Sequence, residues 1–207
     1  FTNLDFESYA GGTTFDELLP GWQADTNHMG SLADDVPIST AGAGIVTTNN
    51  PDVRPVEGRY SAILSAGQSW PTPGWYPTVT IWQTAMVPEG ATHIQFLSSR
   101  PLTNEWTMTW GYTNFVTYSY TLGSVDLLSG SAVEVSNDLY RYTTSIGSLA
   151  GQTSTLSFSL RVNPDLGPGA YHHVLDDIEF ISIPEPSVCS VFVLGLLVLA
   201  ASSARRP

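Results

Sequence analysis

The residues from Thr153 to Val162 constrain the fold of this chain more than any other stretch. Their side chains alternate without a slip, with Leu156, Phe158 and Leu160 on one side and mostly Thr and Ser on the other. This period of two residues is that of a β-strand with one buried face. No stretch before residue 183 shows a convincing 3.6-residue period, so the sequence predicts an all-β protein.

Similar strands are expected along the rest of the body, separated by turns rich in Gly and Pro. In the stretch 78–87, Val79 and Ile81 alternate with Thr residues and with Trp82. Residues 25–57 are poor in pattern and predict long loops with one or two short strands. Many short strands at this spacing predict a jelly-roll β-sandwich. The strands are expected at 1–9, 45–48, 58–64, 78–87, 92–99, 125–128, 132–135, 139–145, 153–162 and 171–183, with two more within 106–122 on either side of Gly111.

The charge of the body excludes some classes of partner. The chain has 207 residues, and before Pro184 it has 18 acidic residues against five Arg and no Lys, a net charge of −13. Nucleic acid is therefore not expected as a partner, because binding to phosphate needs a basic surface. Charged residues make up 13% of the chain, whereas Thr, Ser and Gly are abundant. This composition is typical of exported β-proteins.

The chain divides into a body, 1–182, and a tail, 183–207, which contains three consecutive sequence features. Pro184-Glu185-Pro186 ends the preceding strand, the segment 188–204 has no charged residue, and Arg205-Arg206 follows. As a helix, the segment 188–204 would span about 25 Å, close to the thickness of a membrane core. The membrane-facing residues are expected to include Val188, Leu194, Leu196, Leu197 and Leu199.

This tail resembles the PEP-CTERM sorting signal of Gram-negative bacteria in its Pro184-Glu185-Pro186 motif, its apolar segment and its basic end. The resemblance implies that an exosortase-type enzyme recognises the tail in the inner membrane and cleaves it near the Pro-Glu-Pro motif. The body would then reach the cell surface or the extracellular matrix. The alternative is a plain single-span anchor. The chain begins at Phe1 without Met, so an N-terminal leader that has been removed or left out is also expected.

Sequence motifs for catalysis are missing. The single cysteine, Cys189, lies in the apolar segment, so the body has no disulfide, thiol chemistry or cysteine zinc site. There is no nucleophile elbow, phosphate-binding loop, HExxH motif or dinucleotide fingerprint. We therefore expect a protein that is not an enzyme. A glycan-active enzyme stays open as the less favoured alternative, because paired carboxylates for glycoside hydrolysis form in space and not in sequence.

The body also resembles the galactose-binding-like jelly rolls shared by many carbohydrate-binding modules. The matching stretches are 3–7, 21–22, 58–62, Gln83, 87–88, 150–153 and 175–180. The resemblance implies that the first and last strands are neighbours with a structural calcium ion between them, held by Glu7 and Asp177. Calcium prefers such oxygen ligands. The alternative is that the acidic residues of the last strand form a solvated edge that prevents aggregation.

Aromatic residues suggest where a sugar would bind. Trp70, Trp75 and Tyr76 lie in a Pro-rich loop, where their rings could stack on a polysaccharide or simply cover the end of the core. The remaining tryptophans, Trp22, Trp82, Trp106 and Trp110, lie in or beside strands and are assigned to the core. His172 and His173 point to opposite faces of a strand, so they cannot easily share one metal ion.

The function predicted from these observations is that of a non-catalytic surface or matrix protein that binds polysaccharide. A structural or adhesive protein that binds other proteins is the main alternative.

Overall fold

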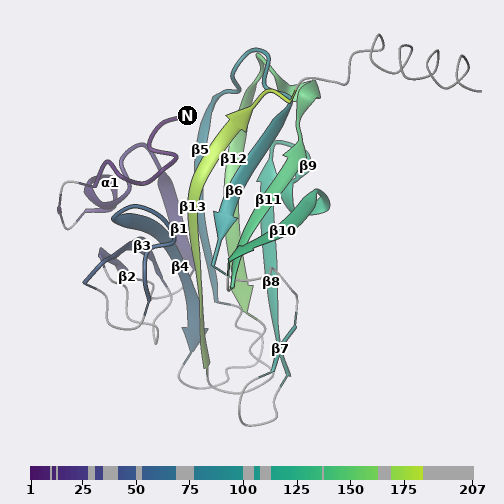
Figure 1. Ribbon diagram of the computed structural model, residues 1–207. Coiled ribbons are helices and arrows are strands. Elements are labelled where there is room, and N and C mark those ends of the chain that lie inside the picture. The colour runs from purple at the N-terminus through teal and green to yellow at the C-terminus, as the bar shows by residue number, and fades with distance from the viewer. Residues whose placement is uncertain are drawn as a thin grey trace, which may run out of the picture.

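Two β-sheets packed face to face make up the body (Figure 1). The computed structural model describes residues 1–9, 11–12, 14–27, 31–34, 42–49, 53–68, 77–99, 105–107, 113–136, 138–162 and 169–183. The six-stranded sheet has the order β1 (Gln23–Asn27), β5 (Thr78–Met86), β12 (Thr153–Val162), β8 (Thr113–Leu122) and β7 (Glu105–Thr107), and β9 (Val125–Asp126) pairs with β8. The seven-stranded sheet has the order β10 (Ser131–Ser136), β11 (Leu139–Ser145), β6 (His93–Ser98), β13 (Gly169–Ile181), β4 (Tyr60–Gln68), β3 (Gly42–Thr47) and β2 (Ser31–Asp34).

The prediction of an all-β sandwich is confirmed. The described helices are single short turns: α1 (Phe15–Leu18), η1 (Leu127–Ser129) and η2 (Gly147–Leu149). β12 covers the predicted residues and lies between β5 and β8. Each strand of this central trio has one buried face, so the alternation seen in the sequence is the alternation between core and outer surface.

The core between the two sheets is built around an aromatic cluster. Phe158 of β12 is fully buried, and its ring centroid lies 5.0 Å from that of Tyr120 on β8 and 5.6 Å from that of Phe96 on β6. Trp22, which precedes β1, packs on the other side at 6.0 Å. Its assignment to the core is confirmed, since its side chain is 2% exposed. Phe158 therefore connects both sheets and the N-terminal segment.

The strand predicted at residues 1–9 is wrong. The segment is a series of turns, with positive φ angles at Asn3 (49°) and Phe6 (55°). Side chains supply the local hydrogen bonds: Asn3 Oδ1 accepts from the Ser8 amide, and Asp5 Oδ1 accepts from the Glu7 amide. Such short polar side chains compete with the hydrogen-bond ladder of a sheet. The segment still lies beside the last strand, because the Ile178 amide donates to the Leu4 carbonyl at 3.0 Å.

A bulge in β13 changes which side chains face the core. The pairing of β13 with β6 shifts register between Asp176 and Glu179, and Asp177 has a φ angle of 46°. Leu175 and Ile178 therefore both belong to the main core, although they are three residues apart. On the outer side, Val174 packs in a second apolar cluster with Val46, Val53 and Ile63. The segment 53–57 thus covers part of the outer face of the seven-stranded sheet.

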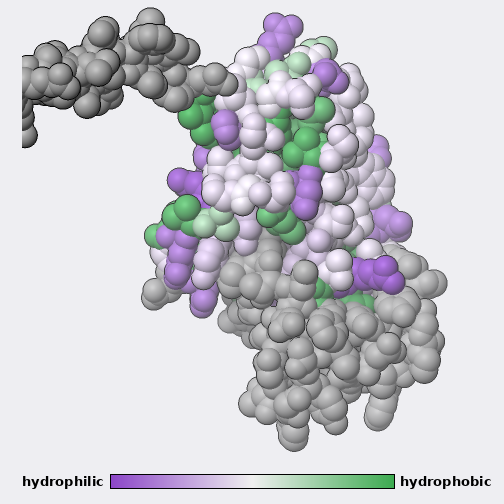
Figure 2. Space-filling view, turned by 90° about the vertical axis from the view of Figure 1, so that its right-hand side faces the viewer, coloured by the Kyte–Doolittle hydropathy of each residue, from purple (hydrophilic) through white to green (hydrophobic). Residues whose placement is uncertain are grey.

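The surface along the edge of the sandwich is mostly neutral and polar. Figure 2 looks at this side and shows pale residues with small, separate hydrophobic and charged areas. The exposed apolar side chains of the described residues are Met86, Val133, Val135 and Ile183. The predicted membrane segment, 188–204, lies outside the described residues. Within the described residues, no helix is long and apolar enough to cross a membrane.

Candidate functional site

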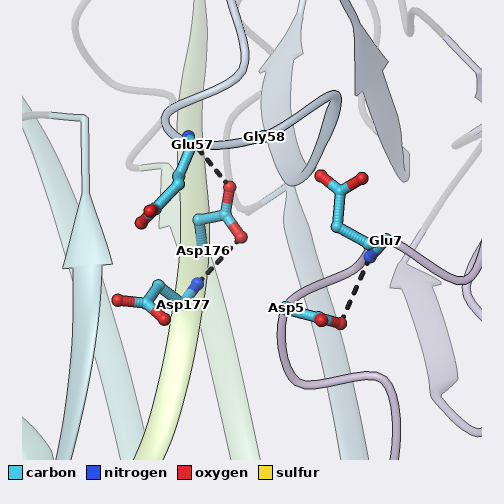
Figure 3. A pocket seen from close by; sticks show the side chains of 6 residues that line it. All are labelled: Asp5, Glu7, Glu57, Gly58, Asp176 and Asp177. Carbon is cyan, nitrogen blue, oxygen red and sulfur yellow. Dashed lines mark hydrogen bonds between the residues drawn. The ribbon is translucent and has the colours of Figure 1, made fainter.

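An acidic pocket of about 280 Å³ lies where the N-terminal turns meet β13. Three segments contribute to it: the turn with Asp5 and Glu7, the loop before β4, and the bulge of β13. Figure 3 shows Asp176 between the other carboxylates, with Glu7 and Asp177 turned in different directions. The residues that line the pocket are Asp5, Glu7, Glu57, Gly58, Asp176 and Asp177.

Glu7 joins the N-terminal segment to the start of β4. Its Oε1 accepts hydrogen bonds from the backbone amides of Arg59, at 2.7 Å, and Tyr60, at 3.0 Å. Gly58, with a φ angle of 58°, makes this approach possible, because a Cβ atom there would lie 2.1 Å from Glu7 Oε1. One oxygen of Glu7 therefore has a structural role, and its second oxygen remains for the pocket.

Asp176 is the buried acid of the pocket, and sequence reasoning did not single it out. Its side chain is 2% exposed. Its Oδ2 accepts from the Glu57 amide at 3.1 Å and from Ser61 Oγ, whereas its Oδ1 accepts from the Asp177 amide at 2.8 Å. Ser61 Oγ in turn accepts from the Val56 amide at 2.8 Å. This network fastens the covering segment 53–57 to the seven-stranded sheet.

Burial raises the pKa of Asp176 from 3.8 to about 7, because a charged carboxylate loses its hydration there. The hydrogen bonds from Ser61, Asp177 and Glu57 act in the opposite direction, and the neighbouring Asp177 carboxylate raises the pKa slightly further. Asp176 therefore changes its charge near neutral pH, inside a pocket that holds several other carboxylates.

The donor chemistry of the pocket fits calcium, although its side chains do not enclose an ion as they stand. All the acidic groups offer hard oxygen atoms, which calcium prefers. Among the residues that the structure describes, no group of three or more His, Cys, Asp or Glu side chains is arranged to hold a metal ion. Asp177 Oδ2 lies 3.9 Å from Arg141 Nη2, and both side chains are partly exposed. Glu7 and Asp177 line the same pocket, and their role as calcium ligands stays a prediction.

A second candidate region is the outer face of the six-stranded sheet. Outward side chains of β5, β12 and β8 alternate with the buried residues Ile81, Phe158 and Tyr120. Nearly all of them carry hydroxyl groups, and we call this surface the hydroxyl face. Its central members, with Gln23 of β1, are Thr80, Trp82, Thr84, Ser119, Thr121, Thr155, Ser157 and Ser159.

The assignment of Trp82 to the core is wrong. Trp82 is partly exposed and lies on the hydroxyl face, opposite Gln23 on one neighbouring strand and Ser157 on the other. The alternation with Val79 and Ile81 already indicated this outward position. The assignment by residue type was wrong because a large indole can lie flat on a sheet as well as inside it.

Hydroxyl groups pair across the strands on both sides of Trp82. Thr80 Oγ1 donates to Ser159 Oγ at 2.9 Å, and the hydroxyls of Thr84 and Thr155 lie 2.7 Å apart. These two pairs hold side chains of β5 and β12 in fixed positions. The indole of Trp82 therefore lies between two pairs of hydroxyl side chains whose positions are fixed by hydrogen bonds.

Trp70, Trp75 and Tyr76 lie outside the described residues, so their role as sugar platforms stays a prediction. His173 faces the six-stranded sheet, where its ring contacts Tyr118 and Tyr120 and its Nε2 lies 3.2 Å from Ser98 Oγ. It is a buried core histidine.

No family model matches this chain, and no curated protein matches it. Solved structures with a similar sandwich include a family 61 carbohydrate-binding module in complex with β-1,4-galactotriose, at 12% identity and a TM-score of 0.45 over 88% of this chain and 97% of that one. The mannan-recognising module TmCBM27 matches at 10% identity with a TM-score of 0.34, and the match covers 80% of this chain and 90% of that one. The enzymatically active domain of a bacteriophage CBA120 tailspike matches at 12% identity with a TM-score of 0.37, and the match covers 84% of this chain and 21% of that one. At these scores the function must be argued from the chain's own residues.

Proposed function

We propose that this chain is an exported, non-catalytic protein whose β-sandwich binds polysaccharide on the hydroxyl face. The observation that supports it most is Trp82, a partly exposed indole surrounded by hydroxyl and amide side chains on three strands. An aromatic ring can stack on the apolar face of a pyranose, and the groups around it can exchange hydrogen bonds with the sugar hydroxyls. The paired hydroxyls beside Trp82 keep this surface ordered before a ligand arrives, which lowers the entropy lost on binding.

Replacement of Trp82 tests the proposal. We expect Trp82→Ala to weaken binding to a polysaccharide roughly tenfold or more, because one aromatic anchor often carries much of the binding energy. Affinity electrophoresis through gels with β-1,4-linked glucan, mannan or galactan would measure the change.

Met86→Ala is the matched control, since Met86 is on the same face of the same strand and is 60% exposed. It should bind like the unaltered protein. Equal retardation of Trp82→Ala and the unaltered protein would contradict the assignment of the site. Self-association without retardation by any glycan would favour the structural or adhesive role, and turnover of a glycan would favour an enzyme.

Calcium is proposed as a structural ion of the acidic pocket, held by Glu7 and Asp177. We expect saturating calcium to raise the unfolding free energy by about 2–3 kcal/mol, or the melting temperature by roughly 4–12 °C for a chain of this size. The melting temperature measured with calcium and with a chelator gives the difference.

Glu7→Gln and Asp177→Asn should each reduce this calcium effect. Glu89→Gln should leave it unchanged, because Glu89 is exposed and lies in the turn between β5 and β6, away from the pocket. Identical melting with calcium and with chelator would rule out a stabilising site.

Export through the tail is the second part of the proposed function. The hydrogen bonds of the body continue to its last described residue: Ser182 Oγ donates to the Gly90 carbonyl, and the Ile183 amide donates to Thr92 Oγ1 at 2.8 Å. Cleavage near Pro184-Glu185-Pro186 would therefore spare these contacts. The proposed processing by an exosortase-type enzyme in the inner membrane, followed by release to the cell surface or matrix, rests on the resemblance of the tail, and these contacts are compatible with it.

The mass of the protein recovered from its own cells tests this step. We expect the extracellular form to end near Pro184-Glu185-Pro186, without the segment 188–204. A form that keeps this segment and Arg205-Arg206 would instead indicate a simple anchored protein.

A further inference from the structure

The hydroxyl face is not uniform, and its middle row differs from the rows beside it. This row runs across four strands through the pairs Gln23–Trp82, Trp82–Ser157 and Ser157–Thr121. Within the part of the chain that the structure describes, the side chains of Gln23, Ser157 and Thr121 have no hydrogen-bond partner. We call Gln23, Trp82, Ser157 and Thr121 the open row.

In the neighbouring rows, the hydroxyls of β5 and β12 bond to each other. On one side Thr80 donates to Ser159, and on the other Thr84 and Thr155 bond to each other. Ser119, opposite Ser159 on β8, has no partner among the described residues, but it is not next to the indole. A hydroxyl that already has a protein partner gains less from a ligand, because the ligand must compete with that partner. Next to the indole, the side chains that are open to new hydrogen bonds therefore lie along the open row.

The spacing of the open row suits an extended chain of pyranose rings. Neighbouring strands lie about 4.8 Å apart, which is close to the advance of one residue in an extended β-linked polysaccharide. A ring stacked on Trp82 would have the amide of Gln23 on one side and the hydroxyl of Ser157 on the other. The next ring along the chain would reach Thr121. A chain laid along β5 would instead meet Thr80 and Thr84, whose hydroxyls are already paired.

The charges near the open row and on the whole body favour an uncharged polysaccharide over a polyanion. The row has no charged side chain from Gln23 to Thr121, and it continues to Asp126, which pairs with Thr121 on β9. Asp126 is exposed, and its Oδ1 accepts from the Leu128 amide. Asp25, which pairs with Thr80 in the next row, is also acidic and exposed, whereas the exposed Arg161 lies two rows away on the outer face of β12, between Thr78 and Thr117. The body before Pro184 has a net charge of −13, so polyanions such as uronates are repelled.

We infer that the ligand is an uncharged, extended β-linked polysaccharide that crosses the strands along the open row. The inference rests on the proposed function, because it requires that the hydroxyl face bind polysaccharide. It adds the direction of the chain, the residues that bond to it and the class of sugar.

Four variants that each remove one hydroxyl group test whether the polysaccharide crosses the strands along the open row. Ser157→Ala and Thr121→Val should each weaken binding roughly three- to tenfold, the loss expected for one hydrogen bond. Thr84→Val and Thr155→Val remove hydroxyls that already bond to each other, and each should weaken binding less than the first two variants do. Thermal melting of each variant identifies any that is merely unstable. The opposite pattern, with large losses only at Thr84 and Thr155, would overturn the direction.

The class of sugar is tested with matched probes. Uncharged β-1,4-linked glucan, mannan and galactan would be compared with partly carboxymethylated forms of the same chains. We expect the uncharged form of at least one chain to bind more tightly than its charged form, with the gap narrowing at high salt. Tighter binding of the charged form would overturn the inference. If no polysaccharide binds, the proposed function fails as well, whereas binding that depends on Trp82 but not on Ser157 or Thr121 overturns only the open row.

Discussion

Phe158→Ala is expected to lower the free energy of unfolding by about 3–5 kcal/mol, the range for loss of a buried aromatic side chain. Phe158 is fully buried and contacts rings from both sheets and from the N-terminal segment. Its removal leaves a cavity that none of the three neighbours can fill without breaking its own packing. Urea unfolding followed by tryptophan fluorescence would measure the loss.

Two controls separate the cavity from other effects. Phe158→Leu keeps much of the volume and should cost clearly less than the alanine variant. Thr155→Ala lies on the same strand with its side chain on the outer face, and it should cost at most about 1 kcal/mol. A cost below about 1 kcal/mol for Phe158→Ala would mean that the sheets do not pack as described.

The stability of the protein without calcium is expected to fall as the pH rises from about 4 to about 7. The folded-state pKa of Asp176 is about 7, and its unfolded value is 3.8. Between these values the folded protein holds a proton that the unfolded chain has released, so the folded state is favoured at the lower pH. The contribution of Asp176 to the free energy of unfolding is fully present below pH 3.8 and is lost as the pH passes 7. It amounts to a few kcal/mol at most, since each pH unit is worth about 1.4 kcal/mol.

A comparison of variants isolates this contribution from that of the other acids. Asp176→Asn cannot titrate, so the unfolding free energy of the unaltered protein relative to this variant should decline between pH 5 and pH 8 in the presence of a chelator. Asp25→Asn is exposed and remote from the pocket, and it should follow the unaltered protein. Parallel curves for Asp176→Asn and the unaltered protein would show that Asp176 is already ionised at pH 5.

The same carboxyl illustrates what could not be read from the sequence. Asp176-Asp177 looks like a pair of surface acids on a last strand, and alternation with Val174 places Asp176 on the outer side of the sheet. The sequence does not show that the segment 53–57 covers this part of the outer side. The Glu57 amide and Asp176 are 119 residues apart in the sequence, so nothing local to the last strand indicates this contact. The burial of Asp176, and with it the raised pKa, is therefore a tertiary effect.

The sequence by itself determined the sandwich class and most strand positions, because alternation of apolar and polar residues follows directly from the geometry of a strand with one buried face. The alternation in 78–87 also placed Trp82 on the same side as its Thr neighbours, although its residue type led to an assignment to the core. Only the tertiary structure decided that Gln23, Ser157 and Thr121 align with Trp82 in one row, because the register between distant strands is fixed by packing of the core and not by any single strand. The turns at Asn3 and Phe6 combine the local hydrogen bonds of Asn3 and Asp5 with contacts to Trp22 and Ile178, which only the tertiary structure shows.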